Sequence, residues 1–208
     1  MSWLSKIFAP APAAVKPTPL PPVPEQPSLP PPPPGTVLTF GEAFDRLIGH
    51  EGKFTDDPKD KGNWTSGRVG VGELKGTKYG ISAMTYPHLD IKNLNLADAK
   101  AIYLRDFWLR AASDQYDGAI AYQVFDAAVN HGIGNAIRFL QRAAGVADDG
   151  AVGPMTLRAV QAMTVTDVLM LFNAERLEFY TKLSTWKTYG KGWARRIVGN
   201  LRYGAADA

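Results

Sequence analysis

One glutamate is a candidate acid catalyst because of its place in a helical pattern. Glu51 follows Phe44, Leu47 and Ile48 at the three- and four-residue spacing of one helix face. The other three residues of that face are apolar. A carboxyl group that lies against a core loses hydration, which raises its pKa, and the negative end of the helix dipole acts in the same direction. Such a protonated acid can donate a proton to a glycosidic oxygen. The alternative is a glutamate that turns to solvent at the helix end.

A glycosidase acid needs a second group, and the loop after Glu51 offers candidates. Asp56, Asp57 and Asp60 follow closely, and any of them could hold a water or stabilise a positively charged sugar transition state. Loop aspartates more often form turns. We prefer Asp60 as the second carboxylate and expect Thr77 and Tyr79, at the start of the next ordered segment, to orient the water.

Metal and thiol chemistry are disfavoured by composition. The chain contains no cysteine, which excludes disulfides and thiolate metal sites. His50-Glu51 resembles the start of a zinc-binding His-Glu-x-x-His motif, but Phe54 stands where the second histidine belongs. We therefore expect neither a metal nor a cofactor.

The charge distribution points to polyanionic partners at the C-terminal end. The net charge is only +3, but no acidic residue lies between Phe179 and Ala206. The same stretch contains Lys182, Lys187, Lys191, Arg195, Arg196 and Arg202. Nucleic acid, anionic lipid or a carboxylate-rich cell wall would be attracted to it, and an ordinary solvated surface is the alternative. No reader motif for nucleic acid is present, so we expect no nucleic-acid partner.

Composition also divides the chain. Thirteen of the 16 prolines lie in residues 10–34, which predicts an extended or disordered arm over residues 1–35. The N-terminus makes a poor signal peptide, because its apolar run is interrupted by Pro10 and Pro12. No segment reaches the roughly 18 apolar residues of a membrane span.

The remaining chain reads as mostly helical. Thr39 and Glu42 form a capping-box pattern before the first helix, and residues 52–80 read as loop with short strands at 68–71 and 77–81. Helices are expected over 95–110, 119–130, 135–144, from Pro154, over 166–183 and over 191–201. This pattern predicts an α+β fold in which helices dominate.

Several sequence blocks, in order, resemble glycoside hydrolase family 108, a family of bacterial and phage N-acetylmuramidases with a lysozyme-like fold. The blocks are His50-Glu51-Gly52, Asp57-Pro58-Lys59-Asp60, Thr77-Lys78-Tyr79-Gly80-Ile81-Ser82, Ala99-Lys100-Ala101-Ile102-Tyr103, Asp106-Phe107-Trp108, Phe125-Asp126-Ala127-Ala128-Val129-Asn130-His131-Gly132, Leu140-Gln141-Arg142-Ala143, Asp149-Gly150-Ala151-Val152-Gly153-Pro154 and Gly190-Lys191-Gly192-Trp193. The resemblance covers about residues 38–200. It implies that Glu51 is the catalytic acid, that residues 36–115 form a lysozyme-like catalytic region, and that residues 116–208 form a helical peptidoglycan-binding region.

Two features depart from the family pattern. Lys53 replaces a second glycine and would lower the pKa of Glu51, although neighbouring helical positions diverge by about 100°. Residues 63–76 are an apparent insertion, which would form a longer hairpin over the cleft with Trp64 stacked on a sugar. The insertion also contains Glu73, so the second catalytic group stays open between Asp60, Thr77 and Glu73.

The resulting functional hypothesis is an endolysin-type muramidase. It would hydrolyse the β-1,4 bond between N-acetylmuramic acid and N-acetylglucosamine in bacterial peptidoglycan and so cause cell lysis. Asn130 and His131 would line the cleft, or alternatively cap their helix. A lytic transglycosylase and a non-catalytic peptidoglycan-binding module are the alternatives. We expect a monomer that accumulates in the host cytoplasm, acts in the periplasm, and touches the anionic outer membrane through its basic C-terminus.

Overall fold

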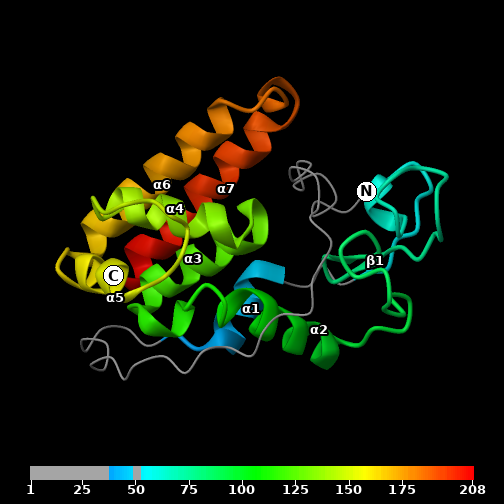
Figure 1. Cartoon of the computed structure of the whole chain (residues 1–208), viewed down its shortest axis with the longest axis horizontal. Coiled ribbons are helices and arrows are strands. Elements are labelled where there is room, and N and C mark those ends of the chain that lie inside the picture. The colour runs from blue at the N-terminus through cyan, green and yellow to red at the C-terminus, as the bar shows by residue number, and fades with distance from the viewer. Residues whose placement is uncertain (1–37, 49–52) are drawn as a thin grey trace. The chain divides into compact units, whose positions relative to one another are not determined.

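The computed structural model describes residues 38–48 and 53–208. The predicted proline-rich arm and Glu51 lie outside these residues. The described chain forms two compact units, Thr39–Leu109 and Arg110–Ala208, with the element order shown in Figure 1. Each unit is described by itself below.

The first unit begins with helix α1 (Phe40–Ile48), which the predicted capping box starts. The Thr39 backbone N–H donates to Glu42 Oε2 at 2.8 Å, and the Glu42 N–H donates to Thr39 Oγ1 at 3.3 Å. The apolar stripe is buried as expected, through Phe44, Leu47 and Ile48. The stripe is described as far as Ile48, the last residue of α1.

The sheet of this unit is small. Strands β1 (Thr77–Lys78) and β2 (Ile81–Ser82) pair antiparallel, with Thr77 opposite Ser82 and Lys78 opposite Ile81. Tyr79 and Gly80 form the two-residue turn, with φ of 51° and 75°, and positive φ at both central residues is typical of a hairpin of this length. The predicted strand at 68–71 is wrong, because Gly67, Gly70 and Gly72 all adopt positive φ and turn the chain there.

The first unit ends in two helical segments. Asn95 caps α2 (Leu96–Tyr103) by accepting the Asp98 N–H at 2.8 Å, as its position predicted. A π-helical segment, η3 (Leu104–Trp108), replaces the last part of the continuous helix expected over 95–110. Aromatic rings then form the core of the unit, through contacts among Phe40, Phe44, Tyr103, Phe107 and Trp108.

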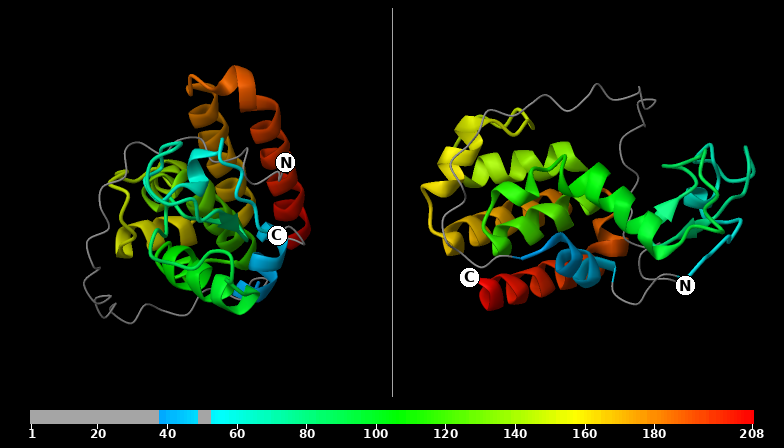
Figure 2. Two further views of the ribbon diagram at one scale, coloured as in Figure 1. Left: turned by 90° about the vertical axis from the view of Figure 1, so that its right-hand side faces the viewer. Right: turned by 90° about the horizontal axis from the view of Figure 1, so that it is seen from below.

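The second unit is a helical bundle built around α3 (Gly118–His131). Every residue of α3 from Gly118 to Val129 is buried, which confirms the expectation of a central helix that is apolar nearly all round. The helices α4 (Ile133–Ala143), α6 (Val165–Thr181) and α7 (Trp186–Asp207) pack against it (Figure 2). The short elements η4 (Ser113–Gln115) and α5 (Pro154–Gln161) complete the unit, with Pro154 in the first turn of α5 as predicted.

Two helix boundaries of the second unit differ from prediction. Thr164, and not Thr166, caps α6 by accepting the Asp167 N–H at 3.1 Å. Helix α7 begins five residues before the expected start at Lys191 and runs through Gly190. A Cβ there would lie 2.7 Å from the Trp186 ring, so glycine allows the indole to pack on the helix backbone.

One buried ion cluster ties three helices of this unit together. Asp126 on α3 accepts hydrogen bonds from Arg176 on α6 at 2.5 Å and from Arg196 on α7 at 2.5 and 2.9 Å. Asn200 Nδ2 donates to the same carboxylate at 2.7 Å. Burial by itself raises the pKa of Asp126, but the guanidinium groups of Arg196 and Arg176 outweigh burial and hold that pKa well below its usual range.

The expected fold class is confirmed, since the chain is mostly helical with one small antiparallel sheet. Among the described helices, none is long and apolar enough by itself to cross a membrane; α5 and α6 meet that criterion only as a pair bent by 119°.

Candidate active site

The turn after the first helix fixes the preferred second carboxylate, Asp60. Asp60 caps the short 3-10 helix η2 (Lys61–Asn63), and its Oδ1 accepts the Gly62 N–H at 2.9 Å. Its Oδ2 accepts no hydrogen bond from the part of the chain that the structure describes, and the residue is half-buried. One carboxylate oxygen is thus used for structure, while no described residue occupies the other.

Asn63 connects this turn to the strand that carries Thr77. Its side chain is fully buried, its Nδ2 donates to the Asp57 carbonyl at 3.0 Å, and its Oδ1 accepts the Thr77 hydroxyl at 2.7 Å. Its own backbone carbonyl accepts the Gly76 N–H at 3.1 Å. Asn63 and Gly76 are the two ends of the apparent insertion, so these contacts close the loop at its base. The insertion therefore leaves Thr77 beside the Asp57–Asp60 turn.

The hydrogen-bonding direction at Thr77 follows from the same contacts. The Asp57 carbonyl can only accept, so the Asn63 amide nitrogen must face it, and the Asn63 oxygen must then face Thr77. The Thr77 hydroxyl proton is consequently committed to Asn63. Toward any further group, Thr77 acts as an acceptor. Sequence reasoning named Thr77 but missed Asn63, which had no local signal beyond its place at the start of the insertion.

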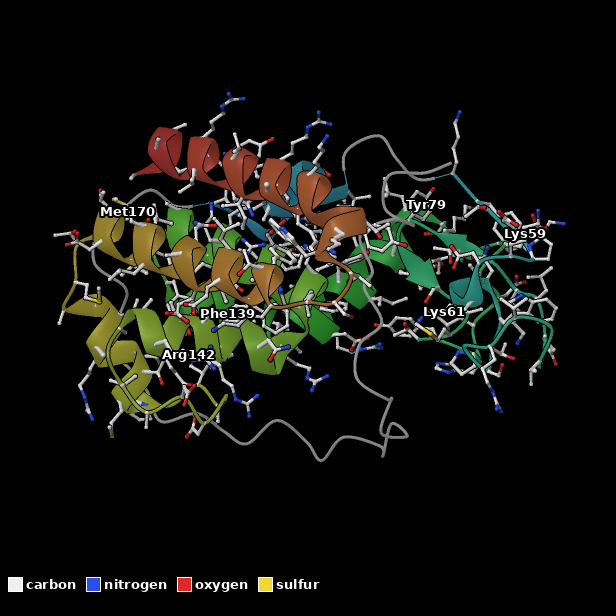
Figure 3. All side chains as sticks on the ribbon, turned by 90° about the horizontal axis from the view of Figure 1, so that it is seen from above. Lys59, Lys61, Tyr79, Phe139, Arg142 and Met170 are labelled. Carbon is white, nitrogen blue, oxygen red and sulfur yellow. The ribbon has the colours of Figure 1, made fainter. Side chains whose placement is uncertain are left out.

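Tyr79 occupies a strained position in the hairpin turn. Its φ of 51° is uncommon for a residue with a side chain, and such strain clusters at functional sites. The Tyr103 hydroxyl donates to the Tyr79 carbonyl at 3.0 Å, and a Cβ on Gly80 would lie 2.5 Å from that hydroxyl oxygen. The half-buried Tyr79 ring lies beside Lys78, whose Nζ is 5.5 Å from the ring centroid. Figure 3 labels Tyr79 on the sheet of the first unit.

The insertion is an ordered loop instead of the expected hairpin. Among the described residues it has one isolated bridge, between Trp64 and Leu74, and a hydrogen bond from the Thr65 N–H to the Glu73 carbonyl at 3.0 Å. The Trp64 indole N–H donates to the Pro58 carbonyl at 2.9 Å, which attaches the half-buried ring to the Asp57–Asp60 turn.

Glu73 is the other carboxylate that the sequence left open as the second catalytic group, and Asp106 is a further carboxylate of the first unit; both have charged partners. Glu73 is 74% exposed in its side chain and pairs with Lys75 at 3.3 Å. Asp106 accepts the Tyr86 hydroxyl at 2.8 Å and two hydrogen bonds from Arg105. Burial, and then the Asp106 carboxylate, raise the pKa of Tyr86, so the phenol stays a donor to Asp106. These contacts favour Asp60 over either residue as the group that meets a water.

Asn130 and His131, the proposed cleft residues at the end of α3, make contacts within the second unit. Asn130 Nδ2 donates to the Asp126 carbonyl at 2.6 Å, one turn back in the same helix. The His131 ring packs against Phe139 and Tyr180, and its Nε2 accepts from Arg176 Nε at 3.3 Å. Burial, followed by the charge of Arg176, holds the pKa of His131 well below its usual value, so the ring is neutral. Contact of either residue with substrate stays a prediction.

The candidate acid Glu51 lies outside the described residues, together with His50. Lys53, the neighbour that departs from the family pattern, is exposed. Among the described residues, no group of three or more histidine, aspartate and glutamate side chains could hold a metal ion.

Comparison with known proteins assigns both halves of the chain. Residues 44–132 match the family described as Glycosyl hydrolase 108, and residues 135–198 match the family described as Predicted Peptidoglycan domain. The first match extends beyond Leu109 through α3, and it spans Glu51, Asp60 and Thr77.

A solved structure described as that of Brucella abortus SagA is 28% identical, with a TM-score of 0.69 over 81% of this chain and 94% of that one. No curated protein matches the chain. Residues 44–132 are therefore similar to the glycosyl hydrolase 108 family and are followed by a predicted peptidoglycan domain, which together support a peptidoglycan-cleaving enzyme.

Proposed function

We propose that the chain is a muramidase that hydrolyses the β-1,4 bond between N-acetylmuramic acid and N-acetylglucosamine, with Glu51 as the general acid. The observation that carries the proposal is the Asn63 link, which holds the Asp57–Asp60 turn beside a Thr77 hydroxyl that can only accept. The buried stripe of α1 supports the role of Glu51, because Glu51 follows Leu47 and Ile48 in sequence at the same four- and three-residue spacing.

Asp60 and Thr77 provide two acceptors for one water. A water that donates one proton to the Asp60 carboxylate and the other to the Thr77 oxygen presents its lone pair to the sugar. Glu51 donates its proton to the glycosidic oxygen, the bond from C1 to that oxygen breaks, the water oxygen attacks C1, and Asp60 takes the water proton. Attack by a water held in this way inverts the configuration at C1.

The first alternative, a lytic transglycosylase, uses no water and forms a 1,6-anhydro sugar. Mass spectrometry of digested, purified peptidoglycan separates the two reactions, because the anhydro product is lighter by one water. We expect reducing-end N-acetylmuramic acid, and proton NMR during early turnover should show the inverted anomer first. Anhydromuramic ends as the main product would contradict the proposal.

The second alternative, a non-catalytic binding module, is tested by Glu51→Gln. This variant keeps the size of the side chain and removes the acid. We expect it to bind purified peptidoglycan like the wild type and to release no soluble fragments. Unchanged fragment release by Glu51→Gln would exclude Glu51 as the acid.

The biological role that we propose is that of an endolysin. The enzyme would accumulate as a monomer in the cytoplasm of a bacterial host and reach the periplasm when a phage-encoded pore opens. Expression in a bacterium should then leave growth unchanged until the inner membrane is permeabilised with chloroform, after which the culture should clear. Clearing without permeabilisation would point instead to a secreted bacterial enzyme, and light scattering at a mass near 22.6 kDa would support the monomer.

A further inference from the structure

The basic residues near the C-terminus fall into two groups in the structure. Lys182 pairs with Glu178 at 2.6 Å, and Arg196 is buried against Asp126. The other four basic residues of the stretch are exposed and form no ion pair with any residue that the structure describes. These four residues are Lys187, Lys191, Arg195 and Arg202.

The four unpaired cations share one side of α7. At 100° per residue, Lys187, Lys191, Arg195 and Arg202 fall within an arc of about 80°. They extend over about 22 Å of helix, at 1.5 Å per residue. Nitrogen-tipped side chains project outward from the α7 ribbon in Figure 3. We call these four residues, with the exposed Val198 that lies among them, the α7 stripe.

Apolar side chains accompany the charges. Val198 lies within the arc and is 46% exposed, and Leu201 lies about 40° beyond the arc and is 43% exposed. The opposite side of α7 already has its partners, since Trp193 stacks on Tyr180 and Gly204 approaches Leu169. The helix is thus attached to its bundle by one face, while the α7 stripe and Leu201 are left to solvent.

We propose that the α7 stripe docks the protein on the surface of an anionic phospholipid bilayer. Cations that reach the headgroups, together with exposed aliphatic side chains that enter the interface between headgroups and acyl chains, are the pattern of an interfacial helix. Nucleic acid and the carboxylates of the wall would also attract the cations. Neither nucleic acid nor the wall would bury the aliphatic side chains of Val198 and Leu201. The exposed face of the stripe also lacks the amide side chains and stacked aromatics that read bases or sugars.

Removal of two charges from the stripe tests the electrostatic part. The double variant Lys191→Gln, Arg195→Gln is compared with the matched control Arg110→Gln, Arg158→Gln. The control pair consists of two exposed arginines of the same unit that make no ion pair with described residues. The full-length protein is sedimented with vesicles of equal parts phosphatidylglycerol and phosphatidylcholine.

Each cation near an anionic membrane contributes about 1 kcal/mol, or about fivefold in partitioning. The stripe variant should therefore bind about 25-fold more weakly, while the control variant and vesicles of pure phosphatidylcholine define the background. Equal binding by wild type and stripe variant, or an equal loss in the control variant, would overturn the proposal.

A second pair, Val198→Ser and Leu201→Ser, tests the choice of lipid over other polyanions. We expect this variant to lose vesicle binding measurably while its weak, salt-dependent retention on duplex DNA and on lipid-free peptidoglycan stays unchanged. Unchanged vesicle binding, combined with wild-type binding to DNA or lipid-free wall at least as tight as to vesicles, would refute a lipid surface. Glu51→Gln should bind vesicles like the wild type, so failure of this proposal is distinguishable from failure of the muramidase assignment.

Discussion

Replacing Asn63 with alanine removes the side chain that joins the Asp57–Asp60 turn to Thr77. Two hydrogen bonds are lost, at 3.0 Å to the Asp57 carbonyl and at 2.7 Å from the Thr77 hydroxyl. Each contributes about 1 kcal/mol net, and the buried site leaves the abandoned groups poorly hydrated, so unfolding should become easier by about 2–3 kcal/mol.

The catalytic effect should exceed the effect on binding. Without Asn63, the Thr77 hydroxyl can rotate and donate its proton toward the water instead of accepting from it. Displacement of a positioned group by about 1 Å can cost about 100-fold in rate, so we expect kcat to fall 10- to 100-fold with little change in KM. The assay is release of soluble fragments from dye-labelled peptidoglycan at a temperature where urea denaturation shows the variant to be folded.

Two variants isolate the reason for the loss. Asn95→Ala removes a helix cap of α2 and costs about 1 kcal/mol of stability without touching the Asp60–Thr77 region, so it should keep its activity. Asn63→Asp retains an acceptor for the Thr77 hydroxyl and should keep more kcat than Asn63→Ala, although a carboxylate facing the Asp57 carbonyl destabilises the fold. An Asn63→Ala protein that is folded and has wild-type kcat would refute the positioning role.

Other parts of the structure give three further predictions. Asp126→Ala leaves Arg176 and Arg196 buried without their carboxylate. It should lower the free energy of unfolding by about 3–5 kcal/mol in urea titrations. A smaller loss would mean that solvent reaches the cluster. Because the folded-state pKa of Asp126 is lowered, its stabilisation is present above the unfolded value near 3.9 and is lost as pH falls further, so stability measured from about pH 5 downward should decline less steeply in Asp126→Ala than in the wild type. Gly80→Ala forces a Cβ to 2.5 Å from the Tyr103 hydroxyl at a φ of 75°, which should cost at least about 1 kcal/mol in thermal unfolding, and a neutral effect would show that the turn relaxes freely.

Local signals predicted the helix starts and stops that depend on a few neighbouring residues. The capping box at Thr39, the cap at Asn95 and the proline in the first turn of α5 all have their predicted roles. Gly132 ends α3 with a φ of 80°. In each of these cases the contact joins atoms within four residues, so the sequence contains both partners of the interaction.

Local signals did not settle every element, because two caps compete at the start of α6 and residues 68–71 need a pairing partner from elsewhere in the chain. The helix expected over 191–201 begins instead at Trp186, and Gly190 lies inside it against the Trp186 ring. A strand was expected at 68–71, but no described segment pairs with these residues, and a strand without a partner has no ladder of hydrogen bonds.

For the candidate site, the sequence by itself proposed Glu51, Asp60 and Thr77 and indicated the family resemblance, because ordered motifs carry that information without geometry. The tertiary structure decided how the insertion is accommodated, since the contact of Asn63 with Thr77 joins residues that only folding brings together. It also divided one basic stretch into a buried arginine, a paired lysine and four exposed cations. The sequence states which chemical groups are present. Hydrogen-bond direction and charge pairing depend on neighbours that are distant along the chain, and only the folded structure brings these neighbours into contact.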